Sequence, residues 1–177
     1  MKLIIWLWNP WIMYEKTRHN VGFLFLDWFI KDLNISENFQ YESKFQGEIV
    51  EYILNWEKIL FLKPQTYMNL SWESVSKVIH FYKIDLANIL VIYDDISLPP
   101  WNIRFRESGS AWWQNGIKNI ILHIGENFKR IKIWIGQDKK WDLSDWVLSK
   151  FYEHEQDKLN NETFIEAKKL VFKHLFL

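Results

Sequence analysis

Short, mostly apolar runs recur along the chain and are separated by polar segments. Such runs are typical of buried strands, because they are too brief for helices and rich in β-branched residues. Where apolar and polar positions alternate instead, the pattern is that of a strand with one exposed face. The sequence predicts strands at residues 2–8, 46–54, 58–62, 89–93, 103–106 and 131–135.

Longer segments between these runs carry apolar residues at the spacing of a helix face. They predict helices at residues 19–33, 71–82 and 115–124, and a charged amphipathic helical region at residues 151–175. Asn69 or Ser71 is expected to cap the second of these helices. Because strands and helices alternate, the expected fold is a single α/β domain built on a mixed sheet.

Composition narrows the class of protein. A length of 177 residues, with 49% hydrophobic and 25% charged residues, suits one ordinary globular domain with a substantial core. The absence of Cys excludes disulfides, zinc–thiolate sites and a Cys nucleophile. No stretch is long enough to span a membrane, and the N-terminal apolar run is too short for a signal peptide, so we expect a cytoplasmic protein.

Positive charge is concentrated in one part of the chain, although the formal net charge is zero. Between Trp101 and Trp141 there are eight basic residues and three acidic ones. This local excess fits two alternatives, a solvated face or a surface that contacts the phosphates of a nucleic acid.

Polar side chains with catalytic potential stand at the predicted ends of strands and starts of helices. His19 can exchange a proton near neutral pH, and a carboxylate such as Asp94 can fix its tautomer. Amides can bind a substrate and a developing oxyanion without adding charge; the candidates are Asn9, Asn69 and Asn115. No Ser or Cys sits in a nucleophile elbow, so the pattern favours direct attack by water. The alternatives are a His that caps a helix and an acidic residue that caps a turn; a metal site lacks a suitably spaced third ligand.

Several longer motifs are spread over the chain in a fixed order. They are residues 7–11 (LWNPW), Tyr14 with 17–23 (TRHNVGF), 63–71 (KPQTYMNLS), 94–95 (DD) with 98–99 (LP), 114–116 (QNG) and 133–136 (IWIG). Through these motifs the sequence resembles the bacterial peptidyl-tRNA hydrolase family over nearly its full length.

The resemblance implies a three-layer α/β/α sandwich with a twisted mixed sheet, formed as one domain by residues 1–177. It implies a monomeric enzyme without cofactor or metal, which cleaves the ester between a peptide and the 3′ end of tRNA. That reaction recycles tRNA from stalled or aborted translation.

Roles for individual residues follow from the same resemblance. His19 would be the general base that activates water, and Asp94 would orient it. The implied substrate-binding residues are Asn9, Tyr14, Met68, Asn69 and Asn115. Arg106 and Lys132 would contact the acceptor end of the tRNA, including its 3′ CCA, and both fall within the basic segment described above.

Two features depart from the family pattern. The family usually has His where this chain has Gln114, which can form hydrogen bonds but cannot titrate. The chain also has 12 Trp and only 6 Gly. Trp occupies positions where the family has Gly or a Gly-type turn, namely residues 6, 8, 11, 56, 72, 101, 112, 113 and 134, with 141 as a further candidate. Our hypothesis is that the gene uses UGA as a Gly codon and that this sequence reads UGA as Trp.

Three alternatives compete with the hydrolase interpretation. The first is a non-catalytic RNA-binding protein on the same fold, and the second is a hydrolase or peptidase that acts on small esters or amides. The third is an inactive chain, because Trp8, Trp11 and Trp113 would crowd the site. The presence of both His19 and Asp94 favours an enzyme, and the basic segment argues against a small substrate.

Overall fold

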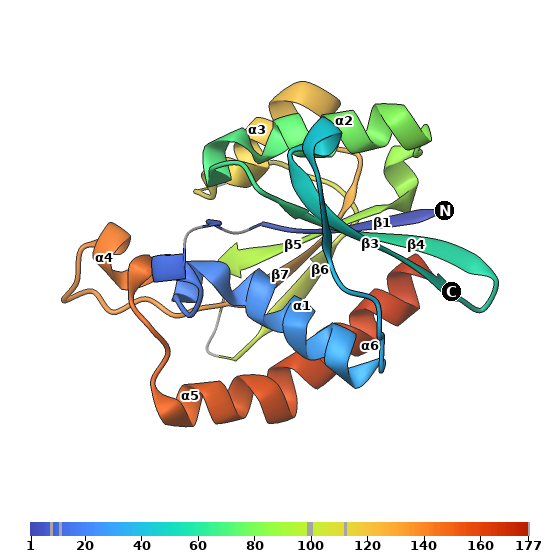
Figure 1. Cartoon of the computed structure of the whole chain (residues 1–177). Coiled ribbons are helices and arrows are strands. Elements are labelled where there is room, and N and C mark those ends of the chain that lie inside the picture. The colour runs from blue at the N-terminus through green and yellow to red at the C-terminus, as the bar shows by residue number, and fades with distance from the viewer. Residues whose placement is uncertain (8, 11, 99–100, 112, 177) are drawn as a thin grey trace.

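A seven-stranded sheet forms the middle of the molecule. The computed structural model describes residues 1–7, 9–10, 12–98, 101–111 and 113–176. Its strands are β1 (Lys2–Trp6), β2 (Gln40–Glu42), β3 (Gly47–Leu54), β4 (Glu57–Pro64), β5 (Ile89–Asp95), β6 (Ile103–Arg106) and β7 (Lys129–Trp134). They lie in the order β2-β3-β4-β1-β5-β7-β6 (Figure 1). Neighbours among β4, β1, β5 and β7 are parallel, and β2, β3 and β6 join antiparallel. The sheet is mixed, and the carboxyl ends of the parallel strands meet at one edge.

Helices cover both faces of this sheet and complete a three-layer α/β/α sandwich. The helices are α1 (Val21–Asp32), α2 (Ser71–Tyr82), α3 (Asn115–Ile124), α4 (Leu143–Leu148), α5 (Glu153–Lys158) and α6 (Phe164–Leu175). Helices α2 and α3 lie on one face, and α1 and α6 lie on the other (Figure 1). The expected three-layer fold is therefore confirmed.

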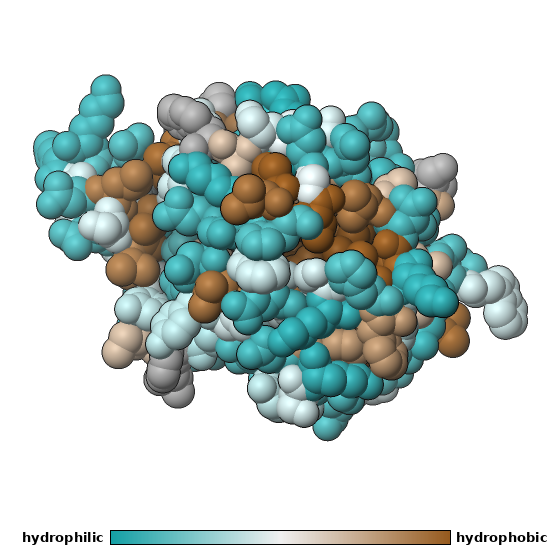
Figure 2. Space-filling view, turned by 90° about the horizontal axis from the view of Figure 1, so that it is seen from above, coloured by the Kyte–Doolittle hydropathy of each residue, from teal (hydrophilic) through white to brown (hydrophobic). Residues whose placement is uncertain are grey.

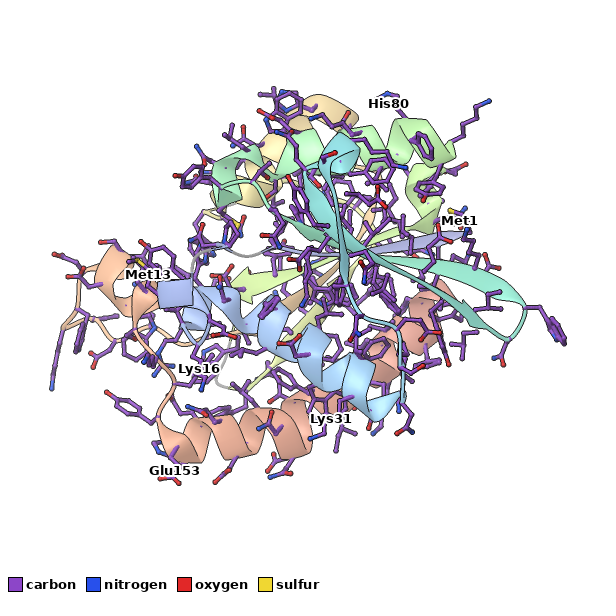
Figure 3. The ribbon with its side chains drawn as sticks, viewed as in Figure 1. Met1, Met13, Lys16, Lys31, His80 and Glu153 are labelled. Atoms are coloured by element: carbon purple, nitrogen blue, oxygen red, sulfur yellow. The ribbon has the colours of Figure 1, made fainter. Side chains whose placement is uncertain are left out.

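Strand β1 shows how the sequence divides the core into two halves. Successive side chains of a strand point to opposite faces of the sheet. Ile4 and Trp6 accordingly pack on the side of α1 and α6, and Leu3 and Ile5 pack on the side of α2 and α3. All four are fully buried, and side chains fill the space on both faces (Figure 3). A strand buried on both faces needs an unbroken apolar run, which is the pattern found there.

The β3–β4 hairpin turns at Asn55 and Trp56, between the strands predicted at residues 46–54 and 58–62. Both residues adopt positive φ angles, 50° and 67°, which is the geometry of a type I′ turn. Trp56 is 99% exposed, so its ring gains nothing from burial at this tip.

The surface above α2 and α3 is polar with apolar side chains between the polar ones (Figure 2). Phe81 of α2 and Leu122 of α3 are among the large apolar side chains exposed on these helices. Within the described residues, no helix is long and apolar enough to cross a membrane.

Some predicted boundaries were wrong for local reasons. Leu70 is the N-cap of α2 and no side chain caps this helix; the Ser71 hydroxyl donates instead to the Met68 carbonyl at 3.0 Å. The first helix starts two residues later than predicted, because residues 18–20 form a 3₁₀ turn. The helical region 151–175 is divided by a π-helical turn at Leu159–Thr163. Two short elements, β2 and α4, were not predicted.

Candidate active site

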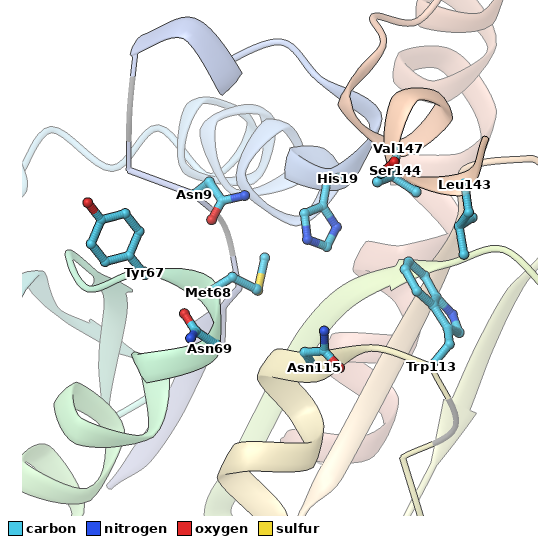
Figure 4. A pocket seen from close by; sticks show the side chains of 10 residues that line it. All are labelled: Asn9, His19, Tyr67, Met68, Asn69, Trp113, Asn115, Leu143, Ser144 and Val147. Carbon is cyan, nitrogen blue, oxygen red and sulfur yellow. The ribbon is translucent and has the colours of Figure 1, made fainter. Parts of the chain in front are cut away.

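A cavity of about 520 Å³ opens at the edge where the parallel strands end (Figure 4). In open α/β sheets this edge is the usual place for a ligand. The cavity is lined by Asn9, His19, Tyr67, Met68, Asn69, Trp113, Asn115, Leu143, Ser144 and Val147. Five of the predicted site residues, Asn9, His19, Met68, Asn69 and Asn115, therefore line one space.

His19 and Asp94 form a hydrogen-bonded pair beside this cavity. His19 lies in η2 (Arg18–Asn20), the 3₁₀ turn that leads into α1, and Asp94 lies near the end of β5. The His19 Nδ1 and the Asp94 Oδ2 are 2.6 Å apart. The Asp94 side chain is fully buried, whereas that of His19 is 13% exposed. Because the carboxylate accepts from Nδ1–H, it leaves Nε2 as the nitrogen with a free lone pair.

The pair changes the acidity of the imidazole. Burial alone lowers the pKa of His19, but the charge of Asp94 and its hydrogen bond outweigh burial and raise the pKa above 6.5. His19 therefore becomes a stronger base than a free imidazole. A raised folded-state pKa also stabilises the fold below the unfolded-state pKa, and this contribution is lost as the pH rises through the folded-state value.

Gly22 allows η2 to approach the sheet this closely. A Cβ at this position would lie 3.0 Å from the Ile92 carbonyl oxygen and 3.3 Å from that of Leu7, both of which are backbone atoms. Any larger residue would push the start of α1 away from β5, and His19 would move with it.

Asn9 is fixed by a residue that the sequence analysis did not single out. The buried side chain of Asn20 accepts from the Asn9 backbone N–H at 2.9 Å and donates to the Asn9 carbonyl at 3.1 Å. A paired donor and acceptor of this kind holds a loop in one orientation. Asn20 follows His19 directly, so one turn carries the imidazole and the support for Asn9.

The remaining amides come from two elements on the opposite side of the cavity. Asn69 lies in η4 (Met68–Leu70), just before α2, and Asn115 is the first residue of α3. Figure 4 shows these side chains around the cavity, across from His19. An ester placed between them would have a base on one side and amide donors on the other.

Like Asp94, the three remaining predicted site residues are not part of the cavity lining. Tyr14 is half-buried in the short 3₁₀ turn Ile12–Tyr14. Arg106 is exposed on the edge strand β6 and stands opposite Arg130 of β7 in the ladder. Lys132 of β7 forms an ion pair with Asp95 at 2.9 Å.

A second buried ion pair, also absent from the sequence analysis, anchors η2. The Arg18 guanidinium is fully buried and binds both carboxylate oxygens of Glu155. It also donates to the Ile135 carbonyl at 3.2 Å and lies over the ring of Trp146 at 4.0 Å from its centroid. These contacts join η2 to the segment containing α4, whose Leu143, Ser144 and Val147 form one wall of the cavity.

The predicted crowding by Trp residues is found only in part. Trp113 lines the cavity, with its ring centroid 6.2 Å from that of His19, and the cavity remains open. Trp8 and Trp11 lie outside the described residues. Among the residues that the structure describes, no three His, Asp or Glu side chains gather where they could hold a metal ion.

Comparison with known proteins identifies relatives over almost the whole chain. A family model described as peptidyl-tRNA hydrolase matches residues 3–176. A peptidyl-tRNA hydrolase from Fusobacterium nucleatum is 49% identical over 161 residues, covering 90% of this chain and 82% of the relative. One from Clostridium novyi is 48% identical over 161 residues, covering 90% of this chain and 84% of the relative.

A solved structure shares the fold as well. The crystal structure of peptidyl-tRNA hydrolase from Acinetobacter baumannii has a TM-score of 0.88 to this chain at 32% sequence identity. The match covers 99% of this chain and 88% of the other.

The His19–Asp94 pair predicts the effect of neutralising the carboxylate. In Asp94→Asn, burial still lowers the pKa of His19, but the charge that raises it is gone. We expect the pKa of His19 to fall below its ordinary value of about 6.5. An NMR titration of the imidazole signals measures it, with the other His residues as internal controls. An unchanged pKa in the variant would show that Asp94 does not act on His19.

Proposed function

We propose a mechanism for this chain, which belongs to the peptidyl-tRNA hydrolase family and hydrolyses peptidyl-tRNA. In it, His19 takes a proton from a water molecule, and the water attacks the ester carbon that joins the peptide to the tRNA. The observation that carries the proposal is the hydrogen bond between His19 and Asp94 at the edge of an open cavity. It gives the imidazole a defined tautomer and a raised basicity.

The steps balance without a covalent intermediate. The water proton moves to Nε2 of His19, and the oxygen of the water bonds to the carbonyl carbon. The resulting tetrahedral intermediate collapses, and the bond between this carbon and the 3′ oxygen of the ribose breaks. The imidazolium then returns its proton to that oxygen. The products are a tRNA with a free 3′ hydroxyl and a free peptide, whose new carboxyl group releases the second water proton to solvent.

The amides bind the reacting groups in this proposal. Asn69 and Asn115 donate to the peptide and to the oxyanion of the tetrahedral intermediate. Asn9, held by Asn20, positions the water and the ester. Met68 supplies an apolar contact, and Tyr14 contacts the substrate beyond the cavity. None of these roles requires a metal or a cofactor.

The tRNA contact is proposed on the basic strands β6 and β7. Arg106 and Lys132 bind phosphates at the acceptor end, including the 3′ CCA. Contacts to phosphates position a nucleic acid without reading its sequence. This suits an enzyme that must accept many different tRNAs. Arg106 is the more exposed of the two, since Lys132 pairs with Asp95.

We also propose that residues 1–177 act as one domain and as a monomer in the cytoplasm. The match of the family model to residues 3–176 supports the single domain. The released peptidyl-tRNA of stalled translation is a cytoplasmic substrate.

We further propose that UGA specifies Gly in the gene and that the Trp residues at Gly-type positions are Gly in the native protein. Trp56 and Trp101 have φ angles of 67° and 63°, a region that favours Gly over bulky residues. The buried Nε1 atoms of Trp6 and Trp113 have no hydrogen-bond partner among the described residues, which is a costly arrangement for a Trp. Trp8, Trp11 and Trp112 lie outside the described residues.

An intact mass of the protein from its native source tests this codon assignment. We expect a mass below that of the printed sequence by at least nine Trp-to-Gly differences, one for each position named above. A mass that contains all 12 Trp, or UGG codons at these positions, contradicts the assignment.

Replacing the base tests the mechanism. We expect His19→Ala to lower kcat for an N-blocked aminoacyl-tRNA by about 10³, the usual contribution of a general base. His80→Ala removes an imidazole on the exposed surface of α2 and should leave kcat unchanged. Thermal unfolding of both variants checks that the fold is intact. A folded His19→Ala protein that retains normal hydrolysis would overturn the proposed role.

Salt dependence tests the proposed tRNA contact. Each phosphate contact makes the log of the binding constant fall more steeply with the log of the salt concentration, by about 0.7 for a single strand and about 0.9 for a duplex, because binding releases counterions. We expect Arg106→Gln to weaken tRNA binding and to make this salt dependence less steep by the contribution of about one phosphate contact. Lys31→Gln, which removes an exposed charge on α1, is the matched control. Equal slopes for Arg106→Gln and the wild type would show that Arg106 does not contact a phosphate of the tRNA.

A further inference from the structure

Gln114 is a buried polar residue that lies outside the cavity but contacts the groups around it. It is the N-cap of α3, and only 2% of its surface is exposed. Its Oε1 accepts from the Ile117 backbone N–H at 2.8 Å. Its Nε2 lies 3.3 Å from the Asp94 Oδ1 and 3.3 Å from the Met68 sulfur. One amide therefore contacts the first turn of α3, the carboxylate and a residue of the cavity lining.

The orientation of this amide follows from its partners. A backbone N–H can only donate, so the atom that faces Ile117 must be the carbonyl oxygen of Gln114. The NH₂ group is then directed toward Asp94, whose Oδ1 accepts from it. The two contacts agree with each other, which fixes the donor on the side of the carboxylate.

We propose that Gln114 is a positioning residue for hydrolysis, and that it holds the second oxygen of Asp94 so that the first stays aimed at His19. The proposal rests on the function proposed above, in which His19 is the base. Asp94 has no exposed surface, so its two oxygens depend on protein donors. The His19 Nδ1–H donates to Oδ2 at 2.6 Å, and the Gln114 NH₂ group donates to Oδ1. Without Gln114, one oxygen of a buried carboxylate would lose its donor.

The contact between Gln114 and Asp94 also affects the basicity of His19. A neutral donor stabilises the carboxylate, and a better stabilised carboxylate holds the proton of the imidazolium less tightly. Removing the donor should therefore raise the pH at which His19 becomes an active base. A neutral amide has this effect at every pH, because it does not titrate itself.

The charged and titratable groups around this pair interact with partners of their own. Tyr93, which precedes Asp94 in β5, interacts with Arg130. Asp95, the next residue of β5, is bound to Lys132, and Glu155 is bound to Arg18. Tyr67 is the other titratable side chain in the cavity lining. The acid limb of the pH profile should therefore report the ionisation of His19.

Gln114→Asn separates positioning from helix capping. Asn is among the best N-cap residues, so it can still accept from the first turn of α3, but it is one methylene too short to reach Asp94. We expect kcat at neutral pH to fall about tenfold with little change in KM, and the acid limb of kcat/KM to move up by about one pH unit. The thermal midpoint should fall by only a few degrees, because the helix cap is kept and a single buried acceptor loses its donor. Gln114→His, whose ring N–H can donate again, should restore most of kcat and the position of the acid limb.

The controls make the outcomes distinguishable. Gln156→Met removes an exposed amide of α5 that donates to the Phe151 carbonyl, and its profile should match the wild type. An unmoved acid limb and an unchanged kcat in Gln114→Asn would overturn the positioning role. So would a Gln114→His protein no more active than Gln114→Asn. If His19→Ala keeps full activity in the same assay, the proposed base fails, and that failure is separate from any result at Gln114.

Discussion

The hydrogen bond between His19 and Asp94 is the interaction on which the site depends. A carboxylate without exposed surface is tolerated only where protein groups replace its hydration, so the buried Asp94 requires donors around it. The 2.6 Å contact to His19 provides one, and it gives the imidazole its tautomer at the same time. The close approach that makes this possible depends on Gly22, since a Cβ there would meet two backbone carbonyls. The close packing at Gly22 thus determines whether His19 can reach Asp94.

The turn that carries His19 is held in place by its neighbours in the sequence. Arg18 points into the protein toward Glu155 and the ring of Trp146, whereas Asn20 binds the backbone of Asn9. Removing one partner of a buried ion pair costs about 3–5 kcal/mol, because the other charge is left unpaired. Through Arg18, His19 and Asn20, this turn contacts α4, β5 and the loop after β1. Such a turn has little freedom to rotate, which suits the role proposed for His19 as a base.

Much of this arrangement could be predicted from the sequence. The bounds of β6 and α3 match the predicted ranges, because their ends coincide with changes of pattern. His19, Asn9, Asn69 and Asn115 were named as candidate site residues, and they line one cavity. The short elements β2 and α4 were missed because three to six residues are too few for a periodicity. The contacts of Arg18 and Gln114 were missed because their partners, Glu155 and Asp94, lie 137 and 20 residues away. The contact of Asn20 was missed because it depends on how the loop after β1 folds back, which a periodicity does not reveal. Gln114 did carry a signal, its departure from the usual His, but nothing in the sequence indicated which atom it would contact.

Strand β5 ends in two acidic residues that point to opposite faces of the sheet. Asp94 faces His19 and the side of α1, whereas Asp95 faces Lys132 on the basic strands. A single peptide unit therefore separates the partner of His19, the proposed base, from the partner of Lys132, the proposed tRNA contact. Because side chains alternate with a period of two, a shift of one residue in this strand would exchange the two carboxylates. Loops around the site can vary in length without changing which face each carboxylate occupies, but the length of β5 cannot. Active homologues should therefore lack insertions and deletions within this strand.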